Sequence, residues 1–461
     1  MNPFRQLLSF FVLSLLFLST VTGQTYKVVD TGQTTAYDED GNVITVSSGE
    51  TYYGQDAHYE GLQMSFQDNG DGTVTDLNTG LMWQQTPPSS GYGWAQAGTY
   101  CEDLELAGYD DWRLPTLKEL FAIGNYSEGW PYFDETYFDI AGETVSKDEQ
   151  FWAQENYVGV SVESGTNGAW GVNHGTGHIK TYPSGAGPSG GKRVRAVRGT
   201  ITTINDYEDN GDGTVTDNAT GLMWSQADNG EGILWVDALA YAEGSELGGY
   251  DDWRLPNIKE LQSIVDYSYS PTATNSDIVG PAIDPIFDCS SITNEAGNDD
   301  YPYFWSGTSA RFQAGSDFYY AWYVAFGMAV NGEGEDFHGA GAVRYDTKAL
   351  DGPAGEDAER YYNYVRLVRG GETSTAAYDL NFREYDLNVY PNPAQNEMTI
   401  SADVELTTIA IYNLSGQNVL NQYPNQNWAT INIGQLANGM YFVKAIAEDE
   451  SVAVQKIIVE R

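Results

Sequence analysis

The sequence contains few of the side chains that perform most enzyme chemistry. Its 461 residues include 2 cysteines and 4 histidines, and the four-residue spacing of His174 and His178 falls in a glycine-rich stretch where a loop is expected. An exported protein could join Cys101 to Cys289 by a disulfide, and the sequence leaves that pairing open. This inventory predicts a protein that is not an enzyme. Paired carboxylates for glycoside hydrolysis stay an alternative, because 65 residues are acidic.

Basic residues are also scarce. The chain has 22 Lys and Arg against 65 Asp and Glu, a net charge of −43. Such a charge repels nucleic acid and anionic membranes, so neither is an expected partner. It is compatible with divalent cations, with cationic partners or with solubility alone. Aromatic residues make up 13% of the chain and are interleaved with the acidic ones, so the chain is expected to fold.

Long apolar runs are confined to the start of the chain. Arg5 precedes an apolar stretch over residues 7–18 and a small, polar segment that ends at Gly23, which is the pattern of a secretory signal peptide over residues 1–23. The stretch is shorter than the roughly 20 apolar residues that span a bilayer, and no later stretch approaches that length. The sequence therefore predicts an exported mature chain without a transmembrane segment.

The most informative feature is an internal duplication. Residues 68–76 (Asp-Asn-Gly-Asp-Gly-Thr-Val-Thr-Asp) recur letter for letter at residues 209–217, and later motifs recur at the same shift of 141 residues. This period is much longer than the roughly 20–50 residues of solenoid repeats. The sequence therefore predicts two tandem domains, residues 24–199 with a lead-in and residues 205–370.

Each copy is expected to contain both helices and strands. Asn-Gly and Asp-Gly turns precede a β-favouring run, and a helical apolar spacing begins at Trp94 and at Trp235. Gly108 and Gly249 are expected to end these helices. A linker over residues 371–386 and a small all-β domain over residues 387–461 follow.

The repeated Trp-Arg-Leu-Pro motif is expected to brace the fold. A partly buried Arg requires a carboxylate or carbonyl partner. Thr116 with Glu119, and Asn257 with Glu260, match the capping pattern at the start of a helix. A bracing role is therefore predicted for Trp112, Arg113, Pro115, Trp253, Arg254 and Pro256.

The acidic turns leave calcium open as a cofactor, and no other cofactor is indicated. An EF-hand is excluded, because the position that requires a bidentate Glu holds Asn78 in copy one and Ala219 in copy two. Tight turns explain the Gly, Asn and Asp residues fully. For a looser site with oxygen ligands, the candidate residues are Asp68, Asp71, Asp76, Asp209, Asp212 and Asp217.

Candidate ligand-binding residues lie in the variable half of each copy. Aromatic faces can stack on sugar rings, although the alternation along residues 318–326 favours a core position for about half of them. The acidic, Gly-rich residues 331–359 lie where copy two is longer, and we expect this insert to carry specificity. The candidates are Trp170, Tyr319, Tyr320, Trp322, Tyr323, Glu333, Glu335 and Asp336.

Four strings near the C-terminus carry a family resemblance. They are Leu-Asn-Val-Tyr-Pro-Asn-Pro at 387–393, Ile-Tyr-Asn-Leu-Ser-Gly at 411–416, Leu-Ala-Asn-Gly-Met-Tyr-Phe at 436–442 and Lys-Ile-Ile-Val-Glu-Arg at 456–461. On these strings, residues 387–461 resemble the type A sorting domain of the type IX secretion system of Bacteroidota. The resemblance implies a partner in that secretion machinery, passage through the periplasm, removal of the tail, and release or attachment at the outer cell surface.

A second set of motifs lies in residues 28–370. These are Asp-Thr-Gly-Gln at 30–33, Tyr-Gly-Gln-Asp-Ala at 53–57, Tyr-Asp-Asp-Trp-Arg-Leu-Pro-Thr at 109–116 and the Val-Arg-Gly close. They resemble the Lcl C-terminal domain family, formerly a domain of unknown function, in two copies, although copy two lacks the Asp-Thr-Gly-Gln lead-in. The Arg-Leu-Pro motif and the Arg-Leu-Val-Arg close are similar to the C-type-lectin-like fold.

The family's namesake is an adhesin that binds sulfated polysaccharides, so the resemblance implies adhesion or glycan binding. The negative charge of the chain disfavours a sulfated ligand unless calcium bridges the acidic protein and the sulfate groups. The predicted fold class is α+β, with two tandem C-type-lectin-like domains and then an immunoglobulin-like sandwich. The predicted function is non-catalytic, adhesin-like recognition of an extracellular glycan or surface protein. The alternatives are a structural surface-coat or matrix protein without a small ligand, and a glycan-active enzyme.

Overall fold

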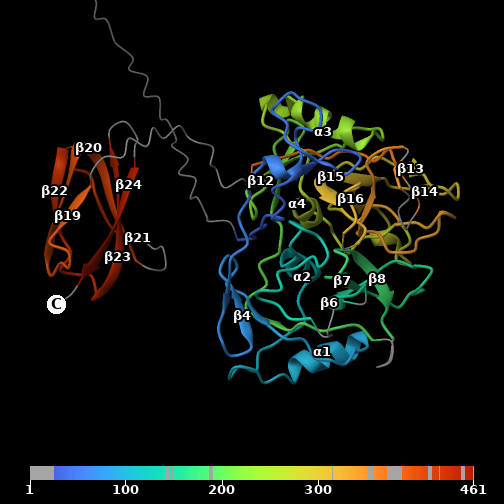
Figure 1. The fold of residues 1–461 in the computed structure, drawn as a ribbon, viewed down its shortest axis with the longest axis horizontal. Coiled ribbons are helices and arrows are strands. Elements are labelled where there is room, and N and C mark those ends of the chain that lie inside the picture. The colour runs from blue at the N-terminus through green and yellow to red at the C-terminus, as the bar shows by residue number, and fades with distance from the viewer. Residues whose placement is uncertain are drawn as a thin grey trace, which may run out of the picture. The chain divides into compact units, whose positions relative to one another are not determined.

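The computed structural model describes two compact units that divide between Glu372 and Thr373 (Figure 1). The described residues are 25–140, 145–147, 149–185, 191–313, 315–350, 352–353, 358, 360–370, 387–413, 418–424, 426–447 and 452–459. The predicted signal peptide and the linker over residues 371–386 lie outside them. Within the described ranges, no helix is long and apolar enough to cross a membrane.

Copy one combines a four-stranded antiparallel sheet, of order β3-β4-β5-β9, with two helices and three further strands. A lead-in precedes it, with β1 (Ala36–Tyr37), β2 (Val43–Ile44) and the 3-10 helix η1 (Asp56–His58). The elements of the copy are β3 (Phe66–Asp68), β4 (Thr73–Asp76), β5 (Met82–Gln84), α1 (Trp94–Glu102), α2 (Leu117–Ala122), β6 (Gln150–Asn156), β7 (Gly168–Asn173), β8 (Ile179–Pro183) and β9 (Val197–Arg198).

Copy two repeats this plan, with the sheet order β10-β11-β12-β18. The register is also repeated: Trp83 pairs with Val74 and Val197, as Trp224 pairs with Val215 and Val368. Its elements are β10 (Tyr207–Asp209), β11 (Thr214–Asp217), β12 (Leu222–Ser225), α3 (Trp235–Glu243), η2 (Leu247–Gly249), α4 (Ile258–Ser263), η3 (Ser276–Ile278), β13 (Ile292–Thr293), β14 (Asp299–Asp300), β15 (Tyr303–Ala310), β16 (Tyr320–Ala325), β17 (Val343–Thr347) and β18 (Val368–Gly370).

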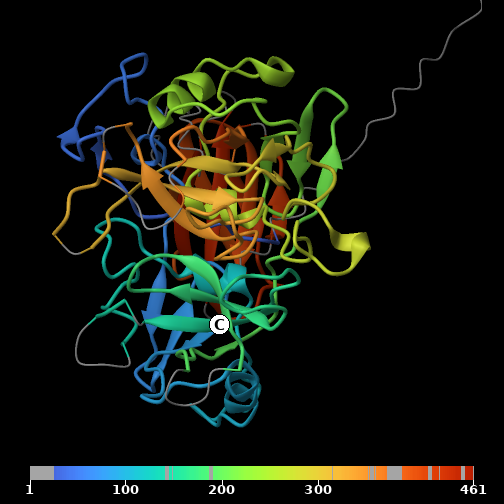
Figure 2. The same cartoon turned by 90° about the vertical axis from the view of Figure 1, so that its right-hand side faces the viewer.

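The two copies share one six-stranded sheet. Its order is β15-β16-β17-β8-β7-β6, so three strands of each copy meet where β17 pairs antiparallel with β8 at Val343 and Ile179. Because β8 and β17 occupy equivalent positions in their copies, this pairing relates the copies by a local two-fold-like symmetry. Figures 1 and 2 show the consequence: α1 and α3 lie at opposite ends of the unit, with α2 and α4 between them. The copies therefore form one folded unit.

The helices begin where the sequence predicts and end earlier. The capping boxes at Thr116 and Asn257 are confirmed. The first helix of each copy starts at Trp94 or Trp235, but it ends at Glu102 or Glu243, well before the glycines expected to end it. The residues between form tight turns, in which Gly108 and Gly249 adopt a positive φ, a conformation that suits a turn.

The two cysteines are free thiols in the structure. Cys101 is fully buried in the core of copy one, and burial raises the pKa of its thiol to about 12. Cys289 lies in copy two, and burial likewise raises the pKa of its thiol to about 12. The disulfide that the sequence left open is therefore not formed.

The second unit is all-β, with an antiparallel path β19-β20-β23-β24 and with β21 and β22 also paired to β20. Its core is made of aliphatic residues such as Ile400, Ile409 and Val443. Its strands are β19 (Asn388–Tyr390), β20 (Glu397–Asn413), β21 (Asn418–Gln422), β22 (Gln426–Asn432), β23 (Gly439–Ala447) and β24 (Val452–Val459).

Candidate functional site

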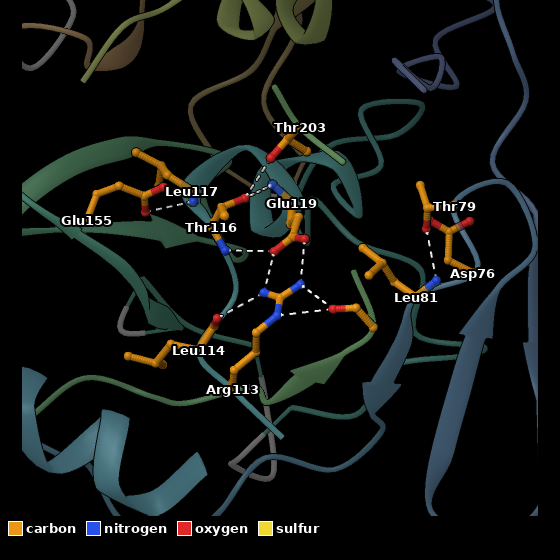
Figure 3. Close-up of polar contacts among 11 residues, drawn as sticks. Asp76, Thr79, Leu81, Arg113, Leu114, Thr116, Leu117, Glu119, Glu155 and Thr203 are labelled. Atoms are coloured by element: carbon orange, nitrogen blue, oxygen red, sulfur yellow. Dashed lines mark hydrogen bonds and ion pairs between the residues drawn. The ribbon is translucent and has the colours of Figure 1, made fainter. Parts of the chain in front are cut away.

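The repeated Arg motif holds the start of the second helix against the end of each copy. Figure 3 shows the Arg113 guanidinium donating two hydrogen bonds to Glu119, of 2.7 and 2.8 Å. Arg113 also donates to Gly199 O at 3.1 Å, and Glu119 accepts from Thr116 N–H at 2.8 Å. One guanidinium thus joins the closing Gly to the helix N-terminus.

Copy two repeats this brace. Arg254 donates to Glu260 at 2.6 and 2.7 Å and to Gly370 O at 3.0 Å. The neighbouring Trp112 and Trp253 are buried. The prolines of the motif contribute their carbonyls: Pro115 O accepts from Gln154 N–H, and Pro256 O accepts from Gly307 N–H. The arrangement is the one a brace requires, and it fixes the walls of the site described next.

A cleft of about 760 Å³ lies where the two copies meet. The wall from copy one is the start of α2 and the end of β6, and the wall from copy two is the turn after α4. The connection between the copies forms the third side. Its polar lining residues are Thr116, Lys118, Gln154, Glu155, Asn156, Thr203, Asn205, Tyr207, Asp266, Tyr267, Ser268 and Asp284, and its aliphatic lining residues are Val158, Ile201, Ile204, Ile264 and Val265.

Lys118 and Glu155 are two of the ionisable groups of this cleft that have shifted pKa values. Lys118 Nζ donates to Asn205 Oδ1 at 2.7 Å, and burial lowers the pKa of its ammonium to about 8. Glu155 accepts from Leu117 N–H at 2.9 Å (Figure 3), and burial raises the pKa of its carboxyl to about 7. Both groups are therefore desolvated by the surrounding walls, and a bound ligand would meet them with little competition from water.

The symmetry of the unit places a second groove opposite this cleft, and the lead-in fills it. Tyr126 N–H donates to Thr31 O at 2.8 Å. The side-chain amide of Gln33 accepts from Ser309 N–H at 2.8 Å and donates to Ser309 O at 3.0 Å. Lys259, the counterpart of Lys118, donates to Asp30 O at 2.8 Å. Thr31 and Gln33 are almost fully buried, so this groove is closed by the chain itself.

The open cleft has the same main-chain geometry as the filled groove. Tyr267 corresponds to Tyr126, and the turns around them match: Asn125 N–H donates to Tyr132 O, as Asp266 N–H donates to Ala282 O. Ser127 N–H donates to Asn125 Oδ1 at 3.0 Å in copy one, and Ser268 N–H donates to Asp266 Oδ1 at 2.9 Å in copy two. Among the described residues, nothing accepts a hydrogen bond from Tyr267 N–H.

Asn156 takes the place of Ser309 on the opposite wall. It faces Ala169 across the β6–β7 pair, while Tyr157 N–H bonds Gly168 O. This pattern makes Asn156 and Ala169 a non-hydrogen-bonded pair, whose main-chain groups point away from the partner strand. Asn156 N–H and C=O therefore lie on the open edge of β6, on the side of the cleft.

Most of the aromatic candidates are in the core, which corrects their expected role. Trp170, Trp322 and Tyr323 have no exposed surface, and Tyr320 is 4% exposed. Trp170 packs on Tyr267 of the other copy. These rings hold the copies together and present no face to a sugar. Tyr319 stays partly exposed and donates to Asp317 at 3.0 Å.

Trp322 packs symmetrically to Trp170, against Tyr126 of copy one. Its ring tip lies over Gly177, which has a φ of +78°. A Cβ at Gly177 would lie 2.8 Å from the Trp322 ring. Both the positive φ and the lack of space for a Cβ therefore require a glycine at this position.

The acidic insert, which we expect to carry specificity, is not a free loop. Residues 331–359 contain β17, a fully buried strand of the shared sheet. Asp336 is buried and accepts a hydrogen bond of 2.5 Å from Tyr157 of copy one. Burial raises the pKa of its carboxyl to about 7. Glu333 and Glu335 are exposed, and their N–H groups bond Asn331 in a turn outside the cleft.

The six candidate metal ligands serve as turn acceptors. Asp68 and Asp71 accept from Gly70 and Thr73, and Asp76 accepts from Asn78 and Thr79. Copy two repeats this with Asp209, Asp212 and Asp217. The pairing of β3 with β4 separates Asp68 from Asp76, because they face Val74 and Phe66. In the described part of the chain, no group of three His, Cys, Asp or Glu residues is placed to hold a metal ion.

Sequence reasoning missed Lys118, Glu155, Asn156 and Tyr267 as site residues. None of them belongs to a chemical motif, and they converge only through contacts between copies. One signal did exist: copy two has no Asp-Thr-Gly-Gln lead-in. That segment, which precedes copy one, fills one groove, and the connection that precedes copy two leaves the equivalent groove open.

Comparison with protein families accounts for both units. The model described as the Lcl C-terminal domain matches residues 72–198 and 213–369, together more than half of the chain. The chain belongs to the Lcl C-terminal domain family. The model described as the secretion system C-terminal sorting domain matches residues 388–460. This sorting domain assigns the protein to export by the type IX machinery and to release or attachment at the outer cell surface.

No curated protein matches the chain. Among solved structures, CopC from Methylosinus trichosporium OB3b is 17% identical over 16% of this chain and 93% of its own, with a TM-score of 0.14. PorZ, an essential surface component of the type IX secretion system of Porphyromonas gingivalis, is 10% identical over 73% of this chain, with a TM-score of 0.15. This chain spans 50% of the length of PorZ. Both scores are too low to carry an argument.

Proposed function

We propose that this protein is a non-catalytic, adhesin-like recognition protein of the cell surface, and that its ligand is an extracellular polysaccharide or glycoconjugate held in the cleft between the copies. The observation that carries the proposal is the cleft itself, whose volume of about 760 Å³ suits a few sugar units. Its amide, hydroxyl and carboxyl side chains match sugar hydroxyls, which both donate and accept hydrogen bonds.

Charge favours a neutral ligand. The net charge of −43 and the carboxylates of Asp266 and Asp284 in the cleft, which outnumber the Lys118 ammonium there, would repel a sulfated glycan. A binding role also suits Lys118 and Glu155, because each already has a hydrogen-bond partner that fixes it: Lys118 bonds Asn205 and Glu155 bonds Leu117. We also propose a C-type-lectin-like fold for each copy and an immunoglobulin-like fold for the second unit, which the Arg-Leu-Pro entry to α2 and α4 and the all-β second unit support.

A glycan array probed with the full chain, in calcium and again in EDTA, tests the proposal. Selective binding to a neutral glycan that survives EDTA is the expected result. Ser268→Trp should block the cleft and weaken binding about tenfold or more, which corresponds to about 1.4 kcal/mol. Ser291→Trp is the control, because Ser291 is exposed and lies outside the cleft. Silence towards every glycan, or equal binding by both variants, would reject this function.

A further inference from the structure

A second hollow lies beside α1, at the end of the first unit opposite to α3 (Figure 1). Its volume is about 420 Å³, and two half-buried tyrosines, Tyr92 and Tyr100, line it. Their ring centroids lie 5.1 Å apart and their planes are tilted by 45°, so the rings are in contact and form one continuous aromatic surface. We call this surface, with the exposed polar residues that line the same hollow, the α1 platform; these residues are Gln96, Thr99, Asp103 and Glu105.

Buried groups hold both rings in place. Tyr92 exchanges main-chain hydrogen bonds with Lys192, and its carbonyl also accepts from the Trp152 indole at 2.8 Å. The Tyr100 hydroxyl accepts from the buried side-chain amide of Gln84 at 2.7 Å, and the other end of that amide is bonded to the main chain. Because the Tyr100 oxygen is the acceptor in this bond, its own proton can be donated to a ligand.

The local fold does not require these side chains, because copy two builds it without them. Ile233 takes the place of Tyr92: its N–H donates to the main chain of the closing segment at 3.0 Å, and its carbonyl accepts from a Trp indole at 3.0 Å. The other replacements, at the shift of 141 residues, are Ala240 for Thr99 and Gly244 for Asp103. The aromatic and polar surface is therefore particular to copy one.

We propose that the α1 platform is a second binding site and that its ligand is an uncharged pyranose of an extracellular glycan. The C–H face of the sugar ring lies on Tyr92 and Tyr100, and the carboxylates of Asp103 and Glu105 accept from its hydroxyls. The site rests on the proposed function for its class of ligand, but it shares no described lining residue with the cleft between the copies.

Charge and ring geometry favour a neutral sugar over a charged ligand. Asp103 and Glu105 disfavour an anion. Lys192 directs its ammonium over the Tyr182 ring, 4.6 Å from the centroid, and does not line the platform. A quaternary ammonium group is bound between aromatic faces that enclose it. The two platform tyrosines contact each other and leave no such space between them, so they suit the face of a sugar ring.

The test is an array of uncharged glycans probed with the full chain carrying Ser268→Trp, which blocks the cleft between the copies. The binding that remains should fall about tenfold or more when Tyr92→Ile or Thr99→Trp is added. Tyr92→Ile installs the residue that copy two holds on the same scaffold, and Thr99→Trp fills the platform from an exposed position, so it decides if the first variant does not fold. Tyr241→Ala is the matched control, because Tyr241 is the counterpart of Tyr100 on α3 and is 44% exposed; it should leave binding unchanged.

Thermal unfolding checks that each variant is folded. If the chains with Tyr92→Ile and Thr99→Trp bind every glycan as the Ser268→Trp chain does, the inference is overturned. A Ser268→Trp chain that binds no glycan would also overturn it and would leave all recognition in the cleft, as the proposed function states. Calorimetry with choline chloride is the third measurement: binding that depends on Tyr92, without any glycan bound there, would replace the sugar by a cationic ligand. If the unaltered chain binds no glycan, the proposed function fails as well.

Discussion

The packing of Trp322 over Gly177 predicts that a single methyl group at Gly177 weakens the joint between the copies. A Cβ there would lie 2.8 Å from Cη2 of Trp322 and 2.9 Å from Cγ of Tyr132. Neither ring can move away, because both are fully buried and their centroids are 5.3 Å apart. Gly177→Ala therefore combines backbone strain with overpacking.

The magnitude follows from these two contributions. A left-handed backbone costs a non-glycine residue about 1 kcal/mol, and an extra methyl group in a packed core costs about 1–3 kcal/mol. The free energy of unfolding should therefore fall by about 2–4 kcal/mol. Gly165→Ala isolates the first contribution, because Gly165 has a φ of +57° and no atom within 4 Å of its Cβ position. It should cost about 1 kcal/mol.

Urea unfolding of the full chain, followed by tryptophan fluorescence, measures both variants. Trp428 is the sole tryptophan of the second unit, and eleven others lie in the first, so the signal reports the joined copies. Gly98→Ala, on α1 with open space around it, should be neutral or stabilise by up to about 1 kcal/mol. If Gly177→Ala lowers the free energy of unfolding no more than Gly165→Ala, Trp322 does not pack on Gly177 and the described joint is wrong.

Further predictions concern the joint, the braces and a buried acid. Because the copies share a sheet, the first unit should unfold in one transition by fluorescence and near-UV circular dichroism, and two separated transitions would contradict this. Arg254→Met should lower the free energy of unfolding by about 3–5 kcal/mol by leaving the Glu260 carboxylate unpaired; Arg113→Met should cost less, since the Arg113 side chain is 24% exposed against 4% for Arg254. The pKa of Asp336, raised by burial to about 7 from an ordinary 3.8, means that the folded state binds its proton more tightly, so stability is fully present below about pH 4 and is lost as pH rises towards 7. Asp336→Asn should flatten this part of the stability profile in urea titrations, and an unchanged slope would refute the assignment.

The sequence alone determined features that depend on neighbouring residues or on direct repetition. The exact string at 68–76 and 209–217 established two copies. The Thr116 and Asn257 caps fixed the starts of α2 and α4, because a cap acts within one helical turn. The C-terminal strings identified the sorting domain.

Only the tertiary structure decided how the copies join and where the site lies. The pairing of Ile179 with Val343 connects edge strands far apart in the chain, and strand partners leave no periodic mark in a sequence. That pairing buries Trp170 and Trp322 between the copies, although their aromatic faces are also typical of sugar-binding surfaces. It also places Gln33 in one groove and leaves the other open, because a single lead-in can fill only one of two symmetric grooves.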